Sequence, residues 1–262
     1  MNNFQIFSEP PTLDNPIGFT YEYWKSIKQH GGYDLNYNNL LKNKKVIIVG
    51  PSPSLEGRGI GEWIDSFDVV VRLNKGFPIE NQHKSDLGSK IDIHYHSLST
   101  GELIGGKVHF KEMKESGVFL TCSYPKEIQP FYMDFVRFYN ENLKWNIPFH
   151  EMNLLYYYEV AKMLGTRPNT GILSILDLLC YDVKELHITG FTWFRDGWRK
   201  TYKDHQKVLG KVEGIKREEA LKKNNFNGIH NQKPQEDLVR EIYLNDDRVF
   251  IDDIMKEILN VK

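Results

Sequence analysis

One segment restricts the fold more than any other. The apolar run Lys45–Val49 (KVIIV) is followed at once by the turn-forming residues GPSPS at positions 50–54. A short apolar run that ends in such a turn is typical of a strand buried on both faces. Strands of this kind occur in parallel sheets whose two faces are covered by helices. The segment therefore predicts the first strand of an α/β protein.

Further along the chain, short apolar runs alternate with segments of helical pattern. This alternation is typical of successive strand–helix units, so we predict a Rossmann-like, mostly parallel sheet with helices on both faces. The predicted strands span residues 45–49, 69–73, 91–95, 118–121, 186–189 and 249–251. The predicted helices span 126–143, 152–164, 171–179, 235–244 and 252–259, and one or two more fall in the lysine-rich stretch 199–224.

The first 43 residues lack this periodicity and carry three prolines among the first sixteen positions. We expect them to form an N-terminal arm or lid. Residues 44–262 are expected to form a single domain, because a chain of 262 residues of which 40% are hydrophobic can bury a substantial core.

Charge and cysteine content exclude several classes of protein. The formal net charge is −1, whereas nucleic-acid-binding proteins usually carry a basic surplus, so no nucleic acid partner is expected. The two cysteines, Cys122 and Cys180, match neither a disulfide framework nor a zinc site.

The N-terminus does not resemble a secretory signal, and no run approaches the roughly 20 apolar residues that cross a bilayer. We therefore expect a cytoplasmic protein.

Ligands of open parallel sheets bind outside the carboxyl ends of the strands. Three polar segments fall there: residues 50–54, Asn74, and the residues from Gly190 onward. The turn at 50–54 has the small residues and hydroxyls that let backbone N–H groups approach a phosphate. An ordinary tight turn explains the same composition, and two prolines remove two N–H donors.

Two further segments allow both a structural and a functional interpretation. Arg72 and Asn74, at the end of the second predicted strand, either mark where the strand reaches the surface or bring an amide to a phosphate or sugar hydroxyl. In the segment 167–171 (RPNTG), Asn169 or Thr170 is a good helix N-cap. The same helix start offers N–H groups and positive potential to an anion, so a cap and a ligand site are compatible there.

Histidine is the natural general base near neutral pH. His230 lies in a polar loop (GIHN) with Glu236 six residues beyond it. On chemistry alone the other candidates remain open, and they are His83, His94, His96, His187 and His205. The acidic pairs 246–247 and 252–253 are explained by a turn before a strand and by the start of the last helix. We therefore predict no metal site.

Together these segments resemble the sialyltransferase family, family 29 of the glycosyltransferases. The stretch from Val46 to Lys90, which contains VIIVG, IDSFDVVVRLN and DLGSK, is similar to that family's large motif. The stretch from Arg167 to Phe191, which contains RPNTGIL and HITGF, resembles its small motif. The segment Trp198–Tyr202 stands where the third motif would fall, and His230 with Glu236 resembles the very small motif. The resemblance covers about residues 44–250.

The resemblance implies a glycosyltransferase-A variant of the Rossmann-like fold. It implies an inverting, metal-independent transfer from a CMP-activated acidic sugar to a glycan or glycolipid, without a cofactor. His230 would remove the proton of the acceptor hydroxyl, with Glu236 nearby. The residues expected to hold the donor are Gly50, Ser52, Ser54, Asn74, Asn169, Thr170, Gly171, Gly190, Phe191 and Tyr202.

Departures from the family pattern affect individual roles. Pro51 replaces an asparagine, and the family's spacing from the histidine to Glu236 is one residue shorter. Val46 stands where the animal enzymes have a cysteine, so Cys180 has no disulfide partner there. The third motif's histidine is replaced by a residue of the segment 199–201 (Arg, Lys, Thr). We take Arg199 as the candidate for assisting the departing phosphate, since a permanent cation neutralises charge but does not deliver a proton at neutral pH.

The donor sugar stays open between sialic acid and Kdo, because both present CMP and a carboxylate. If the acceptor is lipid-linked, the aromatic N-terminal arm would touch a membrane surface. Two other functions remain: a Rossmann-like nucleotide-binding protein without transferase activity, and a pyrophosphokinase-like enzyme. The second of these normally needs magnesium held by carboxylates, which the sequence does not suggest.

Overall fold

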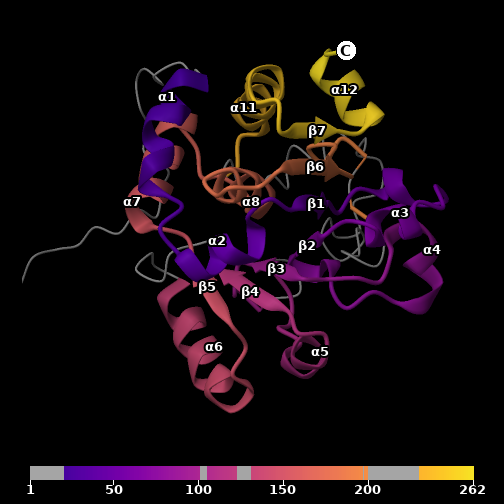
Figure 1. Cartoon of the computed structure of the whole chain (residues 1–262), viewed down its shortest axis with the longest axis vertical. Helices are drawn as coiled ribbons and strands as arrows, with labels where there is room; N and C mark the ends of the chain where they lie inside the picture. The colour runs from indigo at the N-terminus through magenta and orange to yellow at the C-terminus, as the bar shows by residue number, and fades with distance from the viewer. Residues whose placement is uncertain (1–20, 101–104, 123–130, 197, 200–229) are drawn as a thin grey trace, which may run out of the picture.

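A computed structural model describes residues 21–100, 105–122, 131–196, 198–199 and 230–262 (Figure 1). Within these residues the chain forms one seven-stranded sheet in the order β5-β4-β3-β2-β1-β6-β7. Every neighbouring pair of strands is parallel. The predicted Rossmann-like α/β fold is confirmed.

The strands lie close to their predicted positions. β1 (Lys45–Val49), β2 (Val69–Leu73) and β7 (Val249–Ile251) coincide with the prediction, whereas β3 (Ile93–His96), β4 (Phe119–Cys122) and β6 (Glu185–Thr189) are displaced by one or two residues. β5 (Phe149–Glu151) was not predicted. Three residues with a histidine at their centre carry no apolar run, so only pairing with β4 makes this segment a strand.

Helices cover both faces of the sheet, as Figure 1 shows. β1 explains why, since Val46 and Ile48 pack into one core cluster whereas Ile47 and Val49 pack into another on the opposite face. The first face is covered by α1 (Tyr21–Ile27), α2 (Leu35–Leu41), α7 (Leu154–Leu164), α8 (Thr170–Leu178), α11 (Gln232–Asn245) and α12 (Asp253–Leu259). The second is covered by α3 (Gly61–Asp65) and α4 (Lys84–Leu87).

A third core cluster packs α5 (Phe110–Glu115) and α6 (Phe131–Trp145) beside β4. Short 3-10 turns complete the described elements: η1 (Lys28–His30), η2 (Pro53–Leu55), η3 (Asn74–Gly76) and η4 (Asn81–His83). The helix predicted at 126–143 overlaps α6, and those predicted at 152–164, 171–179, 235–244 and 252–259 correspond to α7, α8, α11 and α12. The stretch 200–224 lies outside the described residues.

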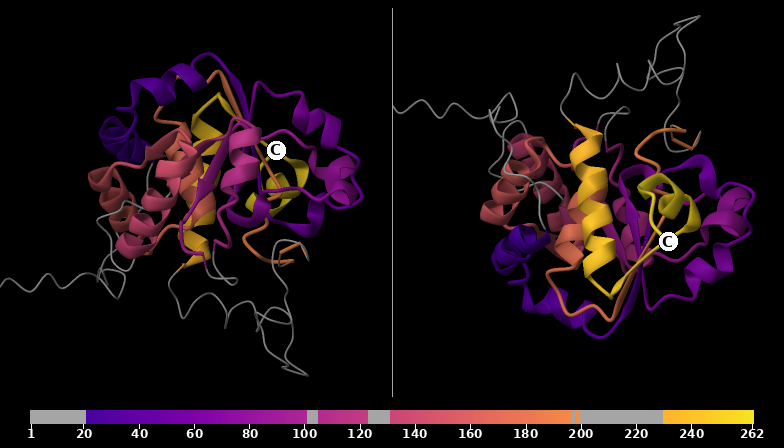
Figure 2. Two further views of the ribbon diagram at one scale, coloured as in Figure 1. Left: turned by 90° about the horizontal axis from the view of Figure 1, so that it is seen from below. Right: turned by 90° about the horizontal axis from the view of Figure 1, so that it is seen from above.

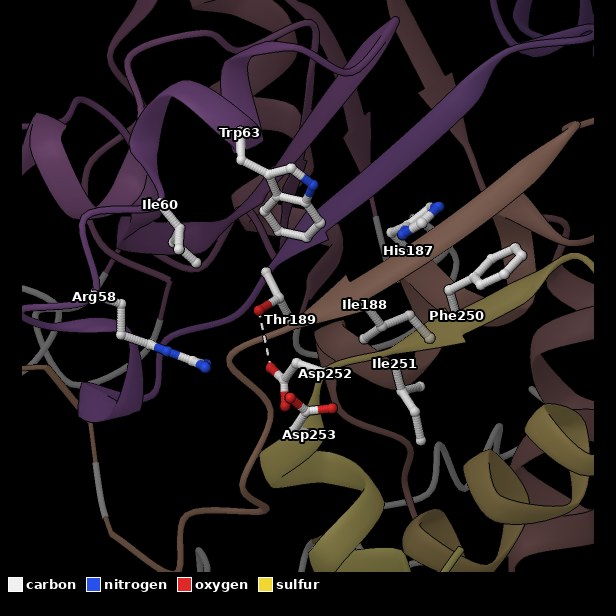
Figure 3. A pocket seen from close by; sticks show the side chains of 10 residues that line it. All are labelled: Arg58, Ile60, Trp63, His187, Ile188, Thr189, Phe250, Ile251, Asp252 and Asp253. Carbon is white, nitrogen blue, oxygen red and sulfur yellow. Dashed lines mark hydrogen bonds between the residues drawn. The ribbon is translucent and has the colours of Figure 1, made fainter. Parts of the chain in front are cut away.

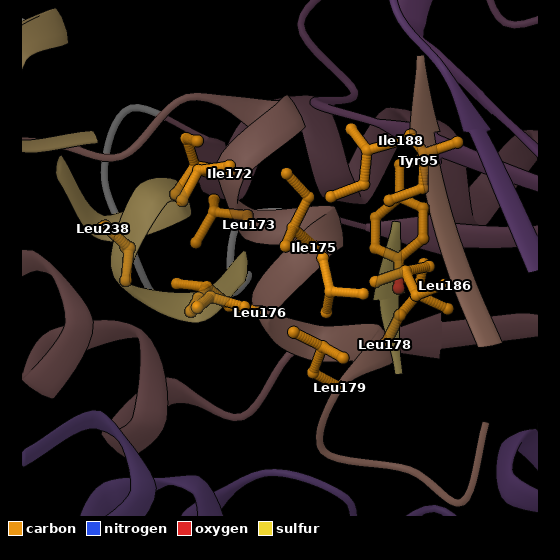
Figure 4. Packing of buried hydrophobic residues seen from close by; sticks show 14 of the residues in the cluster. Tyr95, Ile172, Leu173, Ile175, Leu176, Leu178, Leu179, Leu186, Ile188 and Leu238 are labelled. Carbon is orange, nitrogen blue, oxygen red and sulfur yellow. The ribbon is translucent and has the colours of Figure 1, made fainter. Parts of the chain in front are cut away.

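The helix α8 is the centre of the core. All nine of its residues are buried, with the aliphatic ones packed between the sheet and α11 (Figure 4). On the sheet side they meet Leu186 and Ile188, and on the other side Leu238 of α11 belongs to the same cluster. The views along the sheet show α11 running beside the strands (Figure 2). This packing holds the starts of α8 and α11 over the sheet.

Much of the predicted N-terminal arm is part of the domain core. Within residues 1–43, the described part forms α1, η1 and α2, and Trp24, Tyr37 and Leu41 are fully buried in the largest cluster. Trp24 also donates from its indole Nε1 to the hydroxyl of Tyr156 at 3.0 Å. Packing therefore continues across the expected boundary at residue 44. Residues 1–20 lie outside the described part of the chain.

Candidate active site

The order of the strands reverses at β1. The chain adds β2 to β5 on one side of β1, and then adds β6 and β7 on the other side. Such a switch point is where open α/β sheets bind ligands, beyond the carboxyl ends of the strands. The turns after β1, β2, β3 and β6 and the start of α8 meet there. The sequence-predicted donor residues lie in these turns, apart from Tyr202, which lies outside the described residues.

Two of these turns are packed so closely that only glycine fits. A Cβ on Gly50 would come 2.2 Å from the carbonyl oxygen of Gly190, and one on Gly171 would come 2.5 Å from Cε1 of Phe191. The Phe191 ring thus packs against glycines of two different elements. Gly50, Gly171 and Phe191 therefore join the β1 turn, the β6 turn and the start of α8.

The hydroxyls of the β1 turn are held from the β6 side. Ser52 caps η2 by accepting from the Ser54 amide at 3.0 Å, and its Oγ donates to the carboxylate of Asp196 at 2.9 Å. Ser54 Oγ lies 2.9 Å from Ser52 Oγ. Asp196 also accepts from Thr192 Oγ1, which follows β6. Both predicted serines therefore lie at the switch point, and Ser52 contacts Asp196, which the sequence did not single out.

Asn74 connects three elements. Its backbone is left-handed, with φ of 45°, which asparagine tolerates better than most residues. Its side-chain Oδ1 accepts from the Ser97 amide after β3 at 3.0 Å, and its Nδ2 donates to Thr170 Oγ1 of α8 at 3.3 Å. Two of the predicted donor residues, Asn74 and Thr170, are thus in direct contact.

Behind Asn74 lies a buried histidine. His94 Nε2 is 2.6 Å from the carbonyl oxygen of Asn74. A carbonyl only accepts, so this nitrogen carries the proton. Burial lowers the pKa of His94 to about 4, which keeps the ring neutral at physiological pH. His94 was one of several competing histidines in the sequence, and its contact with Asn74 becomes visible only in the folded chain.

Arg72 is also buried, not at the surface as one reading of the sequence suggested. It is 1% exposed, and its guanidinium donates to the carbonyls of Lys90 at 2.9 Å and Leu87 at 2.7 Å. Burial, followed by the charge of Arg199, lowers the pKa of Arg72 to about 9, so it stays protonated at neutral pH. Arg199 is 4% exposed, and its backbone N–H donates to the carbonyl of Pro51 at 2.9 Å. Two buried cations therefore influence each other here, and the backbone of one, Arg199, contacts the β1 turn.

The start of α8 is capped as predicted. Asn169 has extended backbone angles, and its side chain accepts from the Ile172 amide at 3.0 Å. The backbone N–H of Asn169 donates to Oε1 of Gln235 at 3.0 Å, and Gln235 is a fully buried residue of α11. Gln235 in turn donates to the carbonyl of Asn231 at 2.7 Å. Gln235, which sequence reasoning missed, thus joins the starts of α8 and α11.

His230 precedes α11 and is oriented by the segment before α8. Its Nδ1 lies 2.7 Å from the carbonyl oxygen of Arg167, so Nδ1 carries the proton and the lone pair of the neutral ring is on Nε2. The next amide, that of Asn231, donates to Thr166 Oγ1 at 2.9 Å. The tautomer of His230 is therefore the one that a general base acting through Nε2 requires.

Glu236 forms an ion pair with a different element. Its Oε2 lies 2.9 Å from Arg195 Nη2, and its side chain is 13% exposed. Arg195 follows β6, so this pair links α11 to the loop that also carries Asp196. The orientation of His230 comes from the Arg167 carbonyl, while Glu236 binds α11 to the β6 loop.

The acidic pairs have the structural roles predicted for them. Asp246 accepts from the Arg248 guanidinium at 2.7 and 2.9 Å at the end of α11. Asp252 caps α12 through the Met255 amide at 2.8 Å, and its other oxygen accepts from Thr189 Oγ1 and the Gly190 amide, each at 2.8 Å. Across the described residues, no group of three or more His, Cys, Asp or Glu side chains is arranged to hold a metal ion.

Cys180 has no disulfide partner in the described part of the chain. Burial raises the pKa of its thiol to about 12, and Sγ donates to the carbonyl of Leu176 at 3.2 Å. Among the described residues, no helix is both long and apolar enough to cross a membrane.

Comparisons with known proteins bear on the fold and on one segment of the sequence. Solved sialyltransferases share the fold: a mammalian sialyltransferase in complex with Gal-beta-1-3GalNAc-ortho-nitrophenol has a TM-score of 0.52 and 18% identity, covering 94% of this chain and 90% of that one. CstII from Campylobacter jejuni, in complex with CMP-3FNeuAc, has a TM-score of 0.47 and 17% identity, covering 79% and 81%. A search of curated protein sequences found no match. The model of glycosyltransferase family 29 (sialyltransferase) matches residues 20–129, the segment that contains the β1 turn and Asn74.

Proposed function

We propose that this protein transfers an acidic keto-sugar, sialic acid or Kdo, from its CMP donor to a glycan hydroxyl with inversion and without a metal ion. One observation carries the proposal, namely a continuous set of hydrogen bonds through the switch point. It runs from Asn74 to Thr170, and from the neighbouring Asn169 through Gln235 to α11. His230, at the start of α11, is oriented by Arg167, just before α8. Residues far apart in sequence thus form one unit.

His230 is the base of the proposed reaction. As the acceptor hydroxyl oxygen bonds to the anomeric carbon, Nε2 of His230 takes the hydroxyl proton. The bond between the anomeric carbon and the phosphate oxygen breaks, and CMP leaves with that electron pair. Attack on the face opposite the leaving group inverts the anomeric centre.

Positive charge near the β1 turn would stabilise the departing CMP. The phosphate gains negative charge as the bond breaks, and fixed cations or N–H groups lower the energy of that charge. Arg199, whose backbone N–H donates to Pro51, is buried, and so is Arg72, whose pKa the charge of Arg199 lowers. Together they would supply such a field. In this proposal the two arginines take the role that a metal ion has in other glycosyltransferases. Asn74, Thr170 and the N-terminal amides of α8 would contact the CMP portion.

A donor screen tests the proposal. The full chain is incubated with CMP-sialic acid or CMP-Kdo and with Gal-beta-1-3GalNAc-ortho-nitrophenol, the compound bound in the mammalian structure, with and without EDTA. Mass spectrometry should detect a sugar-extended glycoside, or CMP release by donor hydrolysis, in an amount that EDTA does not change. Loss of turnover with EDTA would contradict metal independence.

Calorimetry with nucleotides tests the donor class separately. Selective binding of CMP and CTP over GMP and UMP, without metal, is the expected result. A preference for ATP with magnesium would contradict the proposal and favour a pyrophosphokinase-like enzyme instead.

A further inference from the structure

A cavity of about 270 Å³ lies outside the proposed donor site, between α3, the ends of β6 and β7, and the start of α12. Figure 3 shows its lining, with Trp63 of α3 on one side, His187 and Phe250 of the strands on another, and Arg58 and Asp253 at its rim. His187 packs against Phe67 of the α3 face, the opposite face of the sheet from α8. No residue proposed for catalysis lines the cavity.

Aromatic rings of fixed orientation dominate this lining. The rings of His187 and Phe250 stack with centroids 4.6 Å apart and an angle of 11°. Trp63 meets His187 edge-on at 6.3 Å and Phe67 at 5.1 Å. Trp63 is nevertheless 45% exposed and Phe250 42% exposed. Partly exposed rings, held in place by one another, are what the C–H face of a pyranose ring stacks on, because the electron-rich ring face attracts those hydrogens.

The charges of the lining give no advantage to an anionic ligand. Two carboxylates, Asp252 and Asp253, face one guanidinium, Arg58. Asp252 is already engaged by Thr189 and Gly190, whereas the side chain of Asp253 is 88% exposed beside Lys256. With Lys256 included, the positive and negative charges balance, so a nucleotide, a phosphate or an acidic sugar would find no positive surplus here. A neutral sugar would instead find charged partners for its hydroxyl groups.

The cavity adjoins the active site through the β6 turn. Thr189 lines the cavity, and the following residues are Gly190, whose amide is held by Asp252, and Phe191, which packs against Gly50 and Gly171. We propose that this cavity binds an uncharged sugar residue of the acceptor glycan, stacked on Trp63 and Phe250 and hydrogen-bonded by Arg58 and Asp253. The assignment to an acceptor rests on the proposed transferase function.

Binding of neutral sugars to the full chain tests this inference independently of turnover. Gal-beta-1-3GalNAc-ortho-nitrophenol and lactose are titrated into protein with ¹⁵N-labelled tryptophan, and the indole signal of Trp63 is assigned from Trp63→Phe. We expect this signal to shift on titration. Phe250→Ala and Arg58→Ala should each weaken binding by up to about tenfold, the scale of one aromatic or hydrogen-bonding contact.

Tyr139→Ala is the matched control, because Tyr139 is a similarly exposed aromatic residue on α6, outside the cavity. It should leave sugar affinity unchanged. An absent shift at Trp63 with both sugars, equal affinities in Phe250→Ala and wild type, or a shift caused by CMP in place of the sugars would each overturn the inference. Donor hydrolysis by the same variants is measured in parallel, and Arg58→Ala should retain it. If wild type neither binds nor turns over any CMP donor, the proposed function fails while the sugar titration still decides on the cavity.

Discussion

His94 donates a hydrogen bond from Nε2 to the backbone carbonyl of Asn74 over 2.6 Å. The bond holds Asn74 in its left-handed conformation, from which the side chain reaches both Ser97 and Thr170. His94 is fully buried and is neutral at physiological pH, so it acts as a hydrogen-bond donor and not as a base. In the proposed mechanism it is a positioning residue for the donor contact.

We therefore expect His94→Ala to weaken CMP binding. The change leaves the Asn74 carbonyl without its buried donor, and one such hydrogen bond is worth roughly a factor of 2 to 10 in affinity. Calorimetry on His94→Ala, Asn74→Ala and the double variant should show that the two effects are not additive. His83→Ala, in the partly exposed turn η4, is the control. Fully additive losses would mean that His94 does not act through Asn74.

His230→Ala should separate catalysis from donor binding. Because the imidazole is proposed to act on the acceptor hydroxyl, kcat should fall by roughly 10²-fold or more while CMP affinity stays close to wild type. Steady-state kinetics and calorimetry measure the two quantities on the same preparation. Full transfer activity in this variant would show that another group is the base.

Gly50→Ala should destabilise the domain. The new methyl group would lie 2.2 Å from the carbonyl oxygen of Gly190, a backbone atom that cannot rotate away. Overpacking of this kind costs about 1–3 kcal/mol of the free energy of unfolding, measured by urea denaturation. Gly76→Ala is a matched control, since its nearest neighbour would be Cβ of Arg72 at 3.7 Å. Equal stabilities of the two variants would contradict the proposed close packing of the β1 and β6 turns.

The buried residue His150 should make the free energy of unfolding depend on pH. His150 of β5 contacts Asp34 through Nδ1 at 3.0 Å and Asp177 through Nε2 at 3.3 Å. Burial alone would lower the pKa of His150, but the two carboxylates outweigh it and the pKa is raised. Its contribution to stability is therefore complete below the unfolded pKa of about 6.5 and is lost as pH rises through the folded pKa.

His150→Phe should accordingly cost more at pH 6 than at pH 9. At pH 6 we expect a loss of about 3 kcal/mol in the free energy of unfolding, because the carboxylate of Asp177, 2% exposed, loses its charged partner. Urea denaturation at both values measures the difference, and His30→Gln, a partly exposed histidine of η1, should show no such dependence. A loss that is the same at both pH values would exclude a charged His150.

Local sequence patterns predicted much of the fold. The runs 45–49 and 69–73 are apolar on both faces, so burial between two helical layers is the arrangement that satisfies them. Asn169 and Asp252 were recognisable as caps because their side chains bond to amides only three residues ahead. β5 escaped prediction because a three-residue strand depends on its partner and not on its own composition.

The candidate active site, like the fold, could be predicted only in part from the sequence. The sequence by itself determined that polar turns follow β1, β2 and β6, and a parallel sheet brings such turns to one edge. It also supplied the resemblance that singled out His230. Only the tertiary structure decided which nitrogen of His230 carries the proton, that Arg72 is buried, and that His94 and Gln235 hold Asn74 and Asn169 in place. These contacts join residues 20 to 66 positions apart, so their geometry depends on how whole elements pack, and no local pattern encodes it.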